Sequence, residues 1–242
     1  MAQSFLQIEG LTKSFGDLVL FENISLGISE GDRIGLIARN GSGKTTLLNI
    51  IMDIEGKDEG SIVWRNDLRV DYLSQDPQFP ADITVGEVCR CKREGNEWIV
   101  DENKDEKEVL DNTSELTRIL TKLKITDLSQ KVSQLSGGQR KRLNIALELI
   151  REPAILFLDE PTSGLSSADT EIVVNLLKEQ TFKGKLIVAN IHQPSSDVFK
   201  LFDRLWLLDK GGYPIYDGNP IEAITYFKRT ANYADAEIST CP

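Results

Sequence analysis

Two glycines and a following lysine in the segment 38–46 could bind the phosphates of a nucleotide. The segment reads ARNGSGKTT and follows the apolar run Ile34–Ile37. Gly41 and Gly43 would let backbone N–H groups curl around an oxyanion, and a helix that begins at Lys44 adds a partial positive charge. In this arrangement Lys44 reaches the β- and γ-phosphates and Thr45 is a ligand of Mg²⁺. The sequence therefore predicts a phosphate-binding loop.

The first position of this loop departs from the usual pattern, because Ala38 stands where such loops have glycine. If the position needs φ > 0, the methyl group costs on the order of 1 kcal/mol. We expect nucleotide binding that is weakened or unaltered, but not lost. The alternative is a glycine turn that binds no ligand.

Two adjacent acids, Asp159 and Glu160, follow the apolar run Ile155–Leu158. Neighbouring side chains at a strand end point in different directions, so the two acids can have different roles. We expect Asp159 to hold Mg²⁺ and Glu160 to polarise the attacking water as a general base. The alternative is a strand-end acid that caps the turn at Pro161-Thr162.

A third motif, LSGGQ at Leu135–Gln139, ends 20 residues before Asp159. Together the three motifs resemble the nucleotide-binding domain of ATP-binding-cassette (ABC) proteins. The resemblance implies an α/β fold, namely a P-loop NTPase with a RecA-like parallel core sheet, an antiparallel β subdomain and a helical subdomain. It also implies that ATP is sandwiched between the phosphate loop of one domain and the LSGGQ signature of another. The expected partner is thus a second nucleotide-binding domain, in a homodimer that forms with ATP.

The resemblance gives roles to further residues. His192, the only histidine, stands where the family has the switch histidine that contacts the γ-phosphate, and Gln75 matches the Q-loop glutamine near Mg²⁺ and water. Phe15 would stack on adenine, with ordinary core packing as the alternative. Ser166 stands where the D-loop of the family usually has Asp, which puts the coupling between the two sites in doubt. The basic segment Arg140–Arg142 is expected to be a solvated turn of the helix that follows the signature.

The predicted site has three overlapping sets. The ATP-binding set is Phe15, Asn40, Gly41, Ser42, Gly43, Lys44, Thr45, Thr46, Ser136, Gly137, Gly138 and Gln139. The catalytic set is Glu160, His192 and Gln75, and the metal set is Thr45, Gln75 and Asp159.

Charge and composition narrow the class of partner. The formal net charge of −10 argues against a nucleic-acid-binding surface, which normally shows a basic excess. The three cysteines lack metal-ligand spacing and are interpreted as free thiols of a reducing compartment. No signal peptide and no apolar run of the roughly 18–20 residues that cross a bilayer are found. We therefore expect a cytoplasmic domain that lies at the cytoplasmic face of a membrane through a transmembrane partner, and the spanning part would come from another polypeptide or from a segment missing from this sequence.

Alternating apolar runs and turns predict the elements that hold these motifs. Residues 4–35 suggest an antiparallel layer, with strands at 5–8, 18–21 and 24–28. Strands are also predicted at 34–37, 61–64, 69–73, 155–159, 186–190, 204–208 and 213–217, and helices at 45–52, 137–151, 167–180 and 195–202. Strands that alternate with helices of 10–15 residues imply a parallel, doubly wound sheet, which binds ligands at the carboxyl ends of its strands.

The predicted organisation has three parts. Residues 1–83 and 135–228 form the ATP-binding core with its antiparallel β layer, and residues 229–242 form a tail or linker. Residues 84–134 are interpreted as the helical subdomain, because aliphatic residues after position 90 are spaced as on helices.

Two ABC subfamilies contribute to the resemblance. Similarity to the F subfamily, which consists of soluble ATPases associated with translation, is found at Leu11–Gly16 and Asp71–Pro77. Similarity to the G subfamily of exporters is found at Glu160–Leu165, His192–Ser195 and Phe202–Leu205. The leading hypothesis is the ATPase domain of an exporter that works by ATP-driven, head-to-tail dimerisation. The alternatives are a soluble F-type ATPase that acts on ribosomes, and an ATP-binding module, natural or chimeric, with little turnover.

Overall fold

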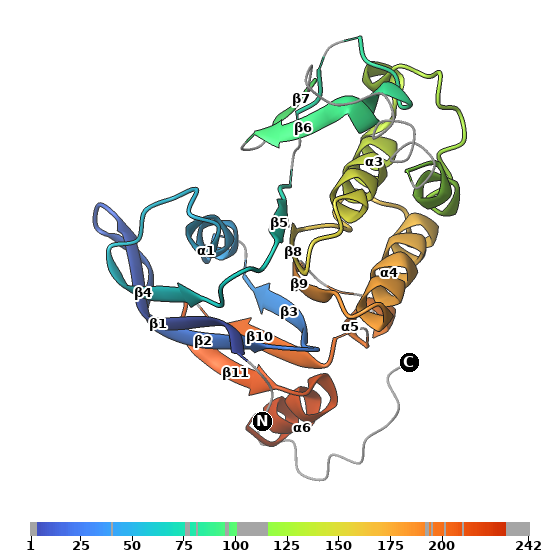
Figure 1. The fold of residues 1–242 in the computed structure, drawn as a ribbon. Coiled ribbons are helices and arrows are strands. Elements are labelled where there is room, and N and C mark those ends of the chain that lie inside the picture. The colour runs from blue at the N-terminus through green and yellow to red at the C-terminus, as the bar shows by residue number, and fades with distance from the viewer. Residues whose placement is uncertain are drawn as a thin grey trace.

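The computed structural model describes residues 4–39, 41–75, 78–80, 82–94, 97–100, 116–191, 194, 196–200, 202–209 and 211–230. Three predictions lie outside these ranges: the phosphate contact of Asn40, the switch role of His192, and most of the tail at 229–242. Within the described ranges the strands form sheets of three, six and two strands (Figure 1).

The three-stranded sheet is the predicted antiparallel layer. Its strands are β1 (Ser4–Phe15), β2 (Leu18–Ser29) and β4 (Glu59–Trp64), in the order β2-β1-β4. The two strands predicted at 18–21 and 24–28 are parts of the single strand β2. Buried side chains of this layer pack with the helix α1 (Lys44–Ile51) in one apolar cluster.

The six-stranded sheet is the core of the molecule, with the order β11-β10-β3-β9-β8-β5. Its strands are β3 (Arg33–Ala38), β5 (Val70–Leu73), β8 (Ile155–Asp159), β9 (Leu186–Asn190), β10 (Arg204–Leu208) and β11 (Pro214–Gly218). All neighbouring strands are parallel except β10 and β11. The prediction of a parallel sheet is therefore confirmed for five strands, and β11 adds an antiparallel edge because a tight turn joins it to β10.

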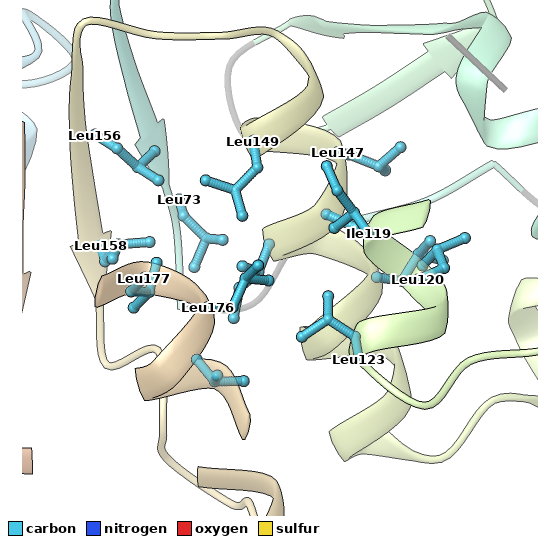
Figure 2. Packing of buried hydrophobic residues seen from close by; sticks show 14 of the residues in the cluster. Leu73, Ile119, Leu120, Leu123, Leu147, Leu149, Leu156, Leu158, Leu176 and Leu177 are labelled. Atoms are coloured by element: carbon cyan, nitrogen blue, oxygen red, sulfur yellow. The ribbon is translucent and has the colours of Figure 1, made fainter. Parts of the chain in front are cut away.

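Both faces of the core sheet are covered, so the side chains of β8 alternate between two apolar clusters. Leu156 and Leu158 pack with α3 (Gly137–Ile150) and α4 (Ser167–Phe182), and Figure 2 shows leucines of both helices around them. Ile155 and Phe157 face the cluster of α1 and the antiparallel layer. Figure 1 shows this layering, with α1 and the antiparallel layer of β1, β2 and β4 on one side of the core sheet and α3 and α4 on the other.

The described residues of the segment 84–134 include strands that were not predicted. The segment contains a two-stranded antiparallel sheet of β6 (Cys91–Glu94) and β7 (Glu97–Val100), between short 3₁₀ turns at Glu87–Arg90 and Val132–Gln134. A helix is present only at 116–122 among the described residues of the segment. Cys91–Glu94 and Glu97–Val100 are strands and not helix, and the indole Nε1 of the buried Trp98 donates to Asn144 Oδ1 of α3 at 2.7 Å. The predicted bounds of the subdomain stay a prediction.

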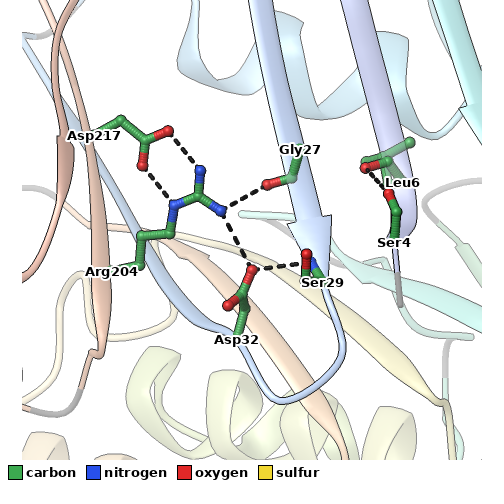
Figure 3. A network of polar contacts seen from close by, with 7 residues as sticks. All are labelled: Ser4, Leu6, Gly27, Ser29, Asp32, Arg204 and Asp217. Atoms are coloured by element: carbon green, nitrogen blue, oxygen red, sulfur yellow. Dashed lines mark hydrogen bonds and ion pairs between the residues drawn. The ribbon is translucent and has the colours of Figure 1, made fainter. Parts of the chain in front are cut away.

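The C-terminal elements anchor the edge of the core sheet. The short α5 (Ser196–Phe199) precedes β10, and α6 (Pro220–Thr230), which was not predicted, buries only Pro220 and Ala223. In Figure 3 the guanidinium of Arg204 on β10 donates to both carboxylate oxygens of Asp217 on β11, at 2.5 Å each, and to the carbonyl of Gly27 on β2 at 2.9 Å. The same guanidinium lies 3.4 Å from Asp32. One side chain thus joins the core sheet to the antiparallel layer.

Candidate functional site

The loop between β3 and α1 has the backbone shape that an anion site needs. Gly41 and Gly43 both have positive φ, 75° and 85°, which L side chains rarely adopt. At Gly43 a Cβ would also lie 3.2 Å from the ring of Phe21 on β2, so the antiparallel layer presses against the loop. At Gly41 a Cβ would meet nothing within 4 Å, so one side of the loop is open. The two positive-φ glycines and the open space at Gly41 thus fit an anion at the start of α1.

Lys44 lies across this loop. Its Nζ donates to the carbonyls of Ala38 and Arg39, at 3.0 and 2.9 Å, and the residue is buried. Burial lowers the pKa of the Lys44 ammonium, whereas the nearby charges of Glu160 and Asp159 raise it. The ammonium is therefore held next to the loop by weak carbonyl partners that a phosphate could replace.

Ala38 does not strain the loop. It is the last residue of β3, lies opposite Leu208 of β10 in the parallel register, and is not among the residues with positive φ. The steric cost that was conditional on a positive φ therefore does not arise. The backbone of this position contributes a carbonyl to Lys44 whichever small side chain it carries.

Behind the loop, Asp159 is fully buried and holds three polar partners. The hydroxyl of Thr45 donates to Asp159 Oδ2 at 2.7 Å, the phenol of Tyr72 lies 3.5 Å from the same oxygen, and the Asn190 amide donates to Oδ1. The strands β8 and β9 position this group, because Asp159 and Asn190 lie opposite each other at their carboxyl ends. A hydroxyl and a carboxylate at the base of an anion loop are the oxygen ligands that Mg²⁺ takes beside phosphates. Two residues of the predicted metal set, Thr45 and Asp159, are thus brought together.

Glu160 is half-buried and follows β8 with a left-handed backbone, φ 48°. Its N–H donates to the carbonyl of Asn190 at 3.0 Å, and its carboxylate Oε2 accepts from Gln75 Nε2 at 3.3 Å. The structure therefore brings the two predicted catalytic residues Glu160 and Gln75 together. Gln75 contacts this acid, and its role as a metal ligand stays a prediction.

The signature residues lie apart from this loop, at the start of α3. Ser136 caps the helix in a reciprocal pair, in which Gln139 N–H donates to Ser136 Oγ at 3.2 Å and Ser136 N–H donates to Gln139 Oε1 at 2.9 Å. Gly137 and Gly138 line a groove of about 540 Å³ that Gln75, Ser163 and Gly164 also line, but that none of residues 41–46 lines. Ser136 and Gly137 are exposed. One chain thus presents two separate half-sites.

Phe15 is 52% exposed, which rules out the alternative of ordinary core packing. The ammonium of Lys13 lies 4.8 Å from the ring centroid, in the range of a cation–π contact. The exposed part of the ring is open to a planar ligand, and adenine as that ligand stays a prediction.

Sequence reasoning missed several polar residues at the site. The segment Arg140–Arg142 is not a solvated turn: only Arg140 is exposed, whereas Lys141 and Arg142 are 9% and 7% exposed. Lys141 Nζ donates to the carbonyl of Glu160 at 2.6 Å, and Arg142 forms an ion pair with Asp169 on α4 at 2.5 Å. A signal for Asn190 was its position at the end of a buried strand, the same position that Asp159 has on β8.

Ser166 has a structural role of its own. It is the N-cap of α4, where its hydroxyl accepts from the N–H of Asp169 at 3.2 Å. Arg142 and Ser166 lower the pKa of the Asp169 carboxyl by hydrogen bonding to its charged form. The serine that replaces the usual Asp of the D-loop therefore caps α4. Its effect on the coupling between the two ATP sites stays a prediction.

Comparison with known proteins agrees with this geometry. The family model described as ABC transporter matches residues 21–163. The chain belongs to the ABC transporter family. It is an ATP-binding domain of that family, with G-family relatives, and the predicted likeness of its N-terminal part to the F subfamily finds no support in these comparisons.

The relatives are longer proteins. The chain is 33% identical to the uncharacterized ABC transporter ATP-binding protein YfmR of Bacillus subtilis, over 97% of the chain and 40% of that protein. It is 31% identical to the ABC transporter G family member 25 of Oryza sativa, over 90% of the chain and 23% of that protein. The chain therefore spans less than half the length of these relatives.

A solved structure confirms the fold of the ABC domain. The ATP-binding cassette MJ0796, described as a dimer in a post-hydrolysis state bound to ADP and Pi, superimposes with a TM-score of 0.72 at 25% identity, over 89% of this chain and 98% of that chain. In the described part of the present chain, no helix combines the length and apolarity needed to cross a membrane.

Proposed function

We propose that this ABC domain binds and hydrolyses Mg-ATP in a head-to-tail dimer and that the cycle powers export through a transmembrane partner. The observation that carries the proposal is the grouping of Thr45, Asp159 and Glu160 behind an open phosphate-binding loop. The loop supplies backbone donors, the hydroxyl and buried acid supply oxygen ligands, and the second acid lies at the end of the same strand.

The residues of the loop have defined tasks in this proposal. The γ-phosphate displaces the Ala38 and Arg39 carbonyls from Lys44, whose ammonium then neutralises phosphate charge. Thr45 and Asp159 would hold Mg²⁺, and that ion would supply positive charge that offsets the charge of the phosphates. The structure fits the ion, because the Thr45 hydroxyl and the Asp159 carboxylate are already in contact.

Glu160 would orient the attacking water and accept its proton as the bond from the water oxygen to the γ-phosphorus forms and the bond from the γ-phosphorus to the β-phosphate oxygen breaks, which releases ADP. Gln75 donates to that carboxylate and so restricts where it points. His192, Asn40 and Thr46 complete the proposed contacts with the phosphates, and Phe15 the contact with adenine. In the dimer the signature of one chain would face the phosphate loop of the second chain and bind the γ-phosphate of the ATP held there. The signature residues are Ser136, Gly137, Gly138 and Gln139.

Two observations favour the dimer. The exposed signature residues and the phosphate loop of one chain lie at different places, so each is half of a site. The related cassette MJ0796 is described as a dimer with ADP and Pi. The relatives include a G-family ABC transporter, which favours transport. A transmembrane partner would then hold this domain at the cytoplasmic face of a membrane.

The test is the solution mass of the Glu160→Gln variant with Mg-ATP. Replacement of the base should lower the ATPase rate by about 10²–10⁴ and retain the closed dimer, so the mass should double from 27.1 kDa. Chelation of Mg²⁺ by EDTA, or a second substitution of Lys44→Ala, should return the protein to monomer. A variant that binds ATP at micromolar concentration yet stays monomeric would contradict the proposed dimer.

The ATPase rate of the wild-type protein distinguishes the proposed function from the alternative of an ATP-binding module with little turnover. Tight ATP binding without release of phosphate would favour that alternative. The unstrained backbone of Ala38 removes one reason to expect it.

A further inference from the structure

Lys141 is a buried cation that the proposed ATPase cycle does not use. It lies on the first turns of α3, two residues after the signature, and is only 9% exposed. A buried ammonium is costly unless oxygen atoms satisfy its protons. Its Nζ donates to the carbonyls of Glu160 at 2.6 Å and of Ser163 at 3.3 Å. Both acceptors belong to the loop that follows β8.

The residue that Lys141 holds has an uncommon backbone. Glu160 has φ 48°, which non-glycine residues rarely adopt, so the surrounding contacts must maintain it. Asn190 accepts the Glu160 N–H, and the Glu160 carbonyl accepts from Lys141 and from the N–H of Ser163 at 3.1 Å. The peptide groups on both sides of the acid are therefore fixed, one by β9 and the other by α3.

A second cation of α3 holds the other end of the same loop. Arg142 forms its ion pair with Asp169 in the first turn of α4, and Ser166 caps that turn. Consecutive residues of α3 thus hold the loop 160–166 at its start and at its end. A movement of α3 relative to β8 acts directly on the backbone of Glu160.

We propose that Lys141 is a positioning residue that sets the orientation of the Glu160 carboxylate and connects it to the signature helix of the same chain. The inference rests on the proposed function, in which Glu160 is the base. The signature of α3 would bind the nucleotide of the second chain, so Lys141 connects occupancy of one composite site to the base of the other. The two composite sites would then communicate through α3 and the loop 160–166. Ser166 ends this loop and caps α4.

The first test compares the steady-state kinetics of Lys141→Met with those of the wild type. A misplaced base should lower kcat by about 10–100-fold and leave KM for ATP within about twofold, because displacement of a catalytic group by about 1 Å has effects of this size. Lys141→Arg, which keeps donors for the carbonyls, should restore most of kcat. In the Glu160→Gln background Lys141→Met should lower the rate no further. The matched control is Lys183→Met, which removes an exposed ammonium after α4.

The second test needs no turnover. Amide hydrogen exchange of the peptide 155–170 in the nucleotide-free protein should be faster by about tenfold in Lys141→Met and unchanged in Lys183→Met. If Lys141→Met does not fold, Lys141→Gln replaces it, because its amide is shorter and cannot serve both carbonyls.

The outcomes separate the two proposals. Unchanged kcat and unchanged exchange in Lys141→Met overturn the positioning role, and so does a loss of rate that adds fully to that of Glu160→Gln. A wild type that binds ATP without hydrolysis overturns the proposed function, and the exchange comparison alone then decides whether Lys141 holds the loop.

Discussion

At the scale of single residues, Ala38 shows why a motif departure has to be judged from the backbone. The position ends β3 with an ordinary strand conformation, and its carbonyl serves Lys44. We predict that Ala38→Gly leaves the ATP dissociation constant within about twofold and lowers the free energy of unfolding by about 0.5–1 kcal/mol, because glycine loses more backbone entropy. Calorimetric titration and denaturant unfolding measure the two quantities. An ATP affinity that rises tenfold would show that the methyl group does hinder the phosphate.

Residue types predicted the loop, the acid pair and the signature, because each motif has few chemical uses at its spacing. They did not predict the residues that contact the acid pair from other elements. Asn190 and Lys141 are single polar residues whose partners lie 31 and 19 positions away in the chain. The sheet order brings Asn190 to Asp159, and the packing of α3 against the sheet brings Lys141 to Glu160. Their pairing depends on tertiary contacts that no local pattern records.

At the scale of elements, strand and helix periods located nearly all of the core sheet, because β8 and β9 are continuous apolar runs bounded by polar residues. The same reasoning failed for residues 91–100. Charged residues of that segment are compatible with either structure, and the burial of Trp98 against α3 decides for a hairpin. It also missed α6, which buries little of its surface.

This contact leads to a prediction for the hairpin of β6 and β7. Trp98→Phe removes the donor to Asn144 Oδ1 and leaves a buried acceptor unsatisfied, so the free energy of unfolding should fall by about 1–3 kcal/mol. The double variant Trp98→Phe with Asn144→Leu, which replaces both polar groups, should lose less than the sum of the two single changes. Denaturant unfolding measures all four proteins. Strict additivity would mean that the hydrogen bond contributes nothing to stability.

At the scale of the whole molecule, the antiparallel layer and the core sheet must move as one unit if the ring of Phe15 and the phosphate loop are to bind the same nucleotide. Arg204 is a joint between them, because its guanidinium contacts Asp217 on β11, Asp32 and the Gly27 carbonyl on β2 (Figure 3). Arg204→Gln should therefore lower the free energy of unfolding by about 1–2 kcal/mol, because it leaves the part-buried Gly27 carbonyl without this donor in addition to breaking partly exposed ion pairs. It should also speed amide exchange in β2.

The chain contains a matched control for this joint. Arg33 forms a similar two-pronged pair with Asp203, but it does so between β3 and the start of β10 within the core sheet, and its partner is 48% exposed. An exposed ion pair contributes about 0–1 kcal/mol, so Arg33→Gln should cost less and leave exchange in β2 unchanged. Equal effects of the two substitutions would mean that Arg204 acts as an ordinary surface pair, and that the packing of Phe21 against the phosphate loop at Gly43 is what joins the two sheets.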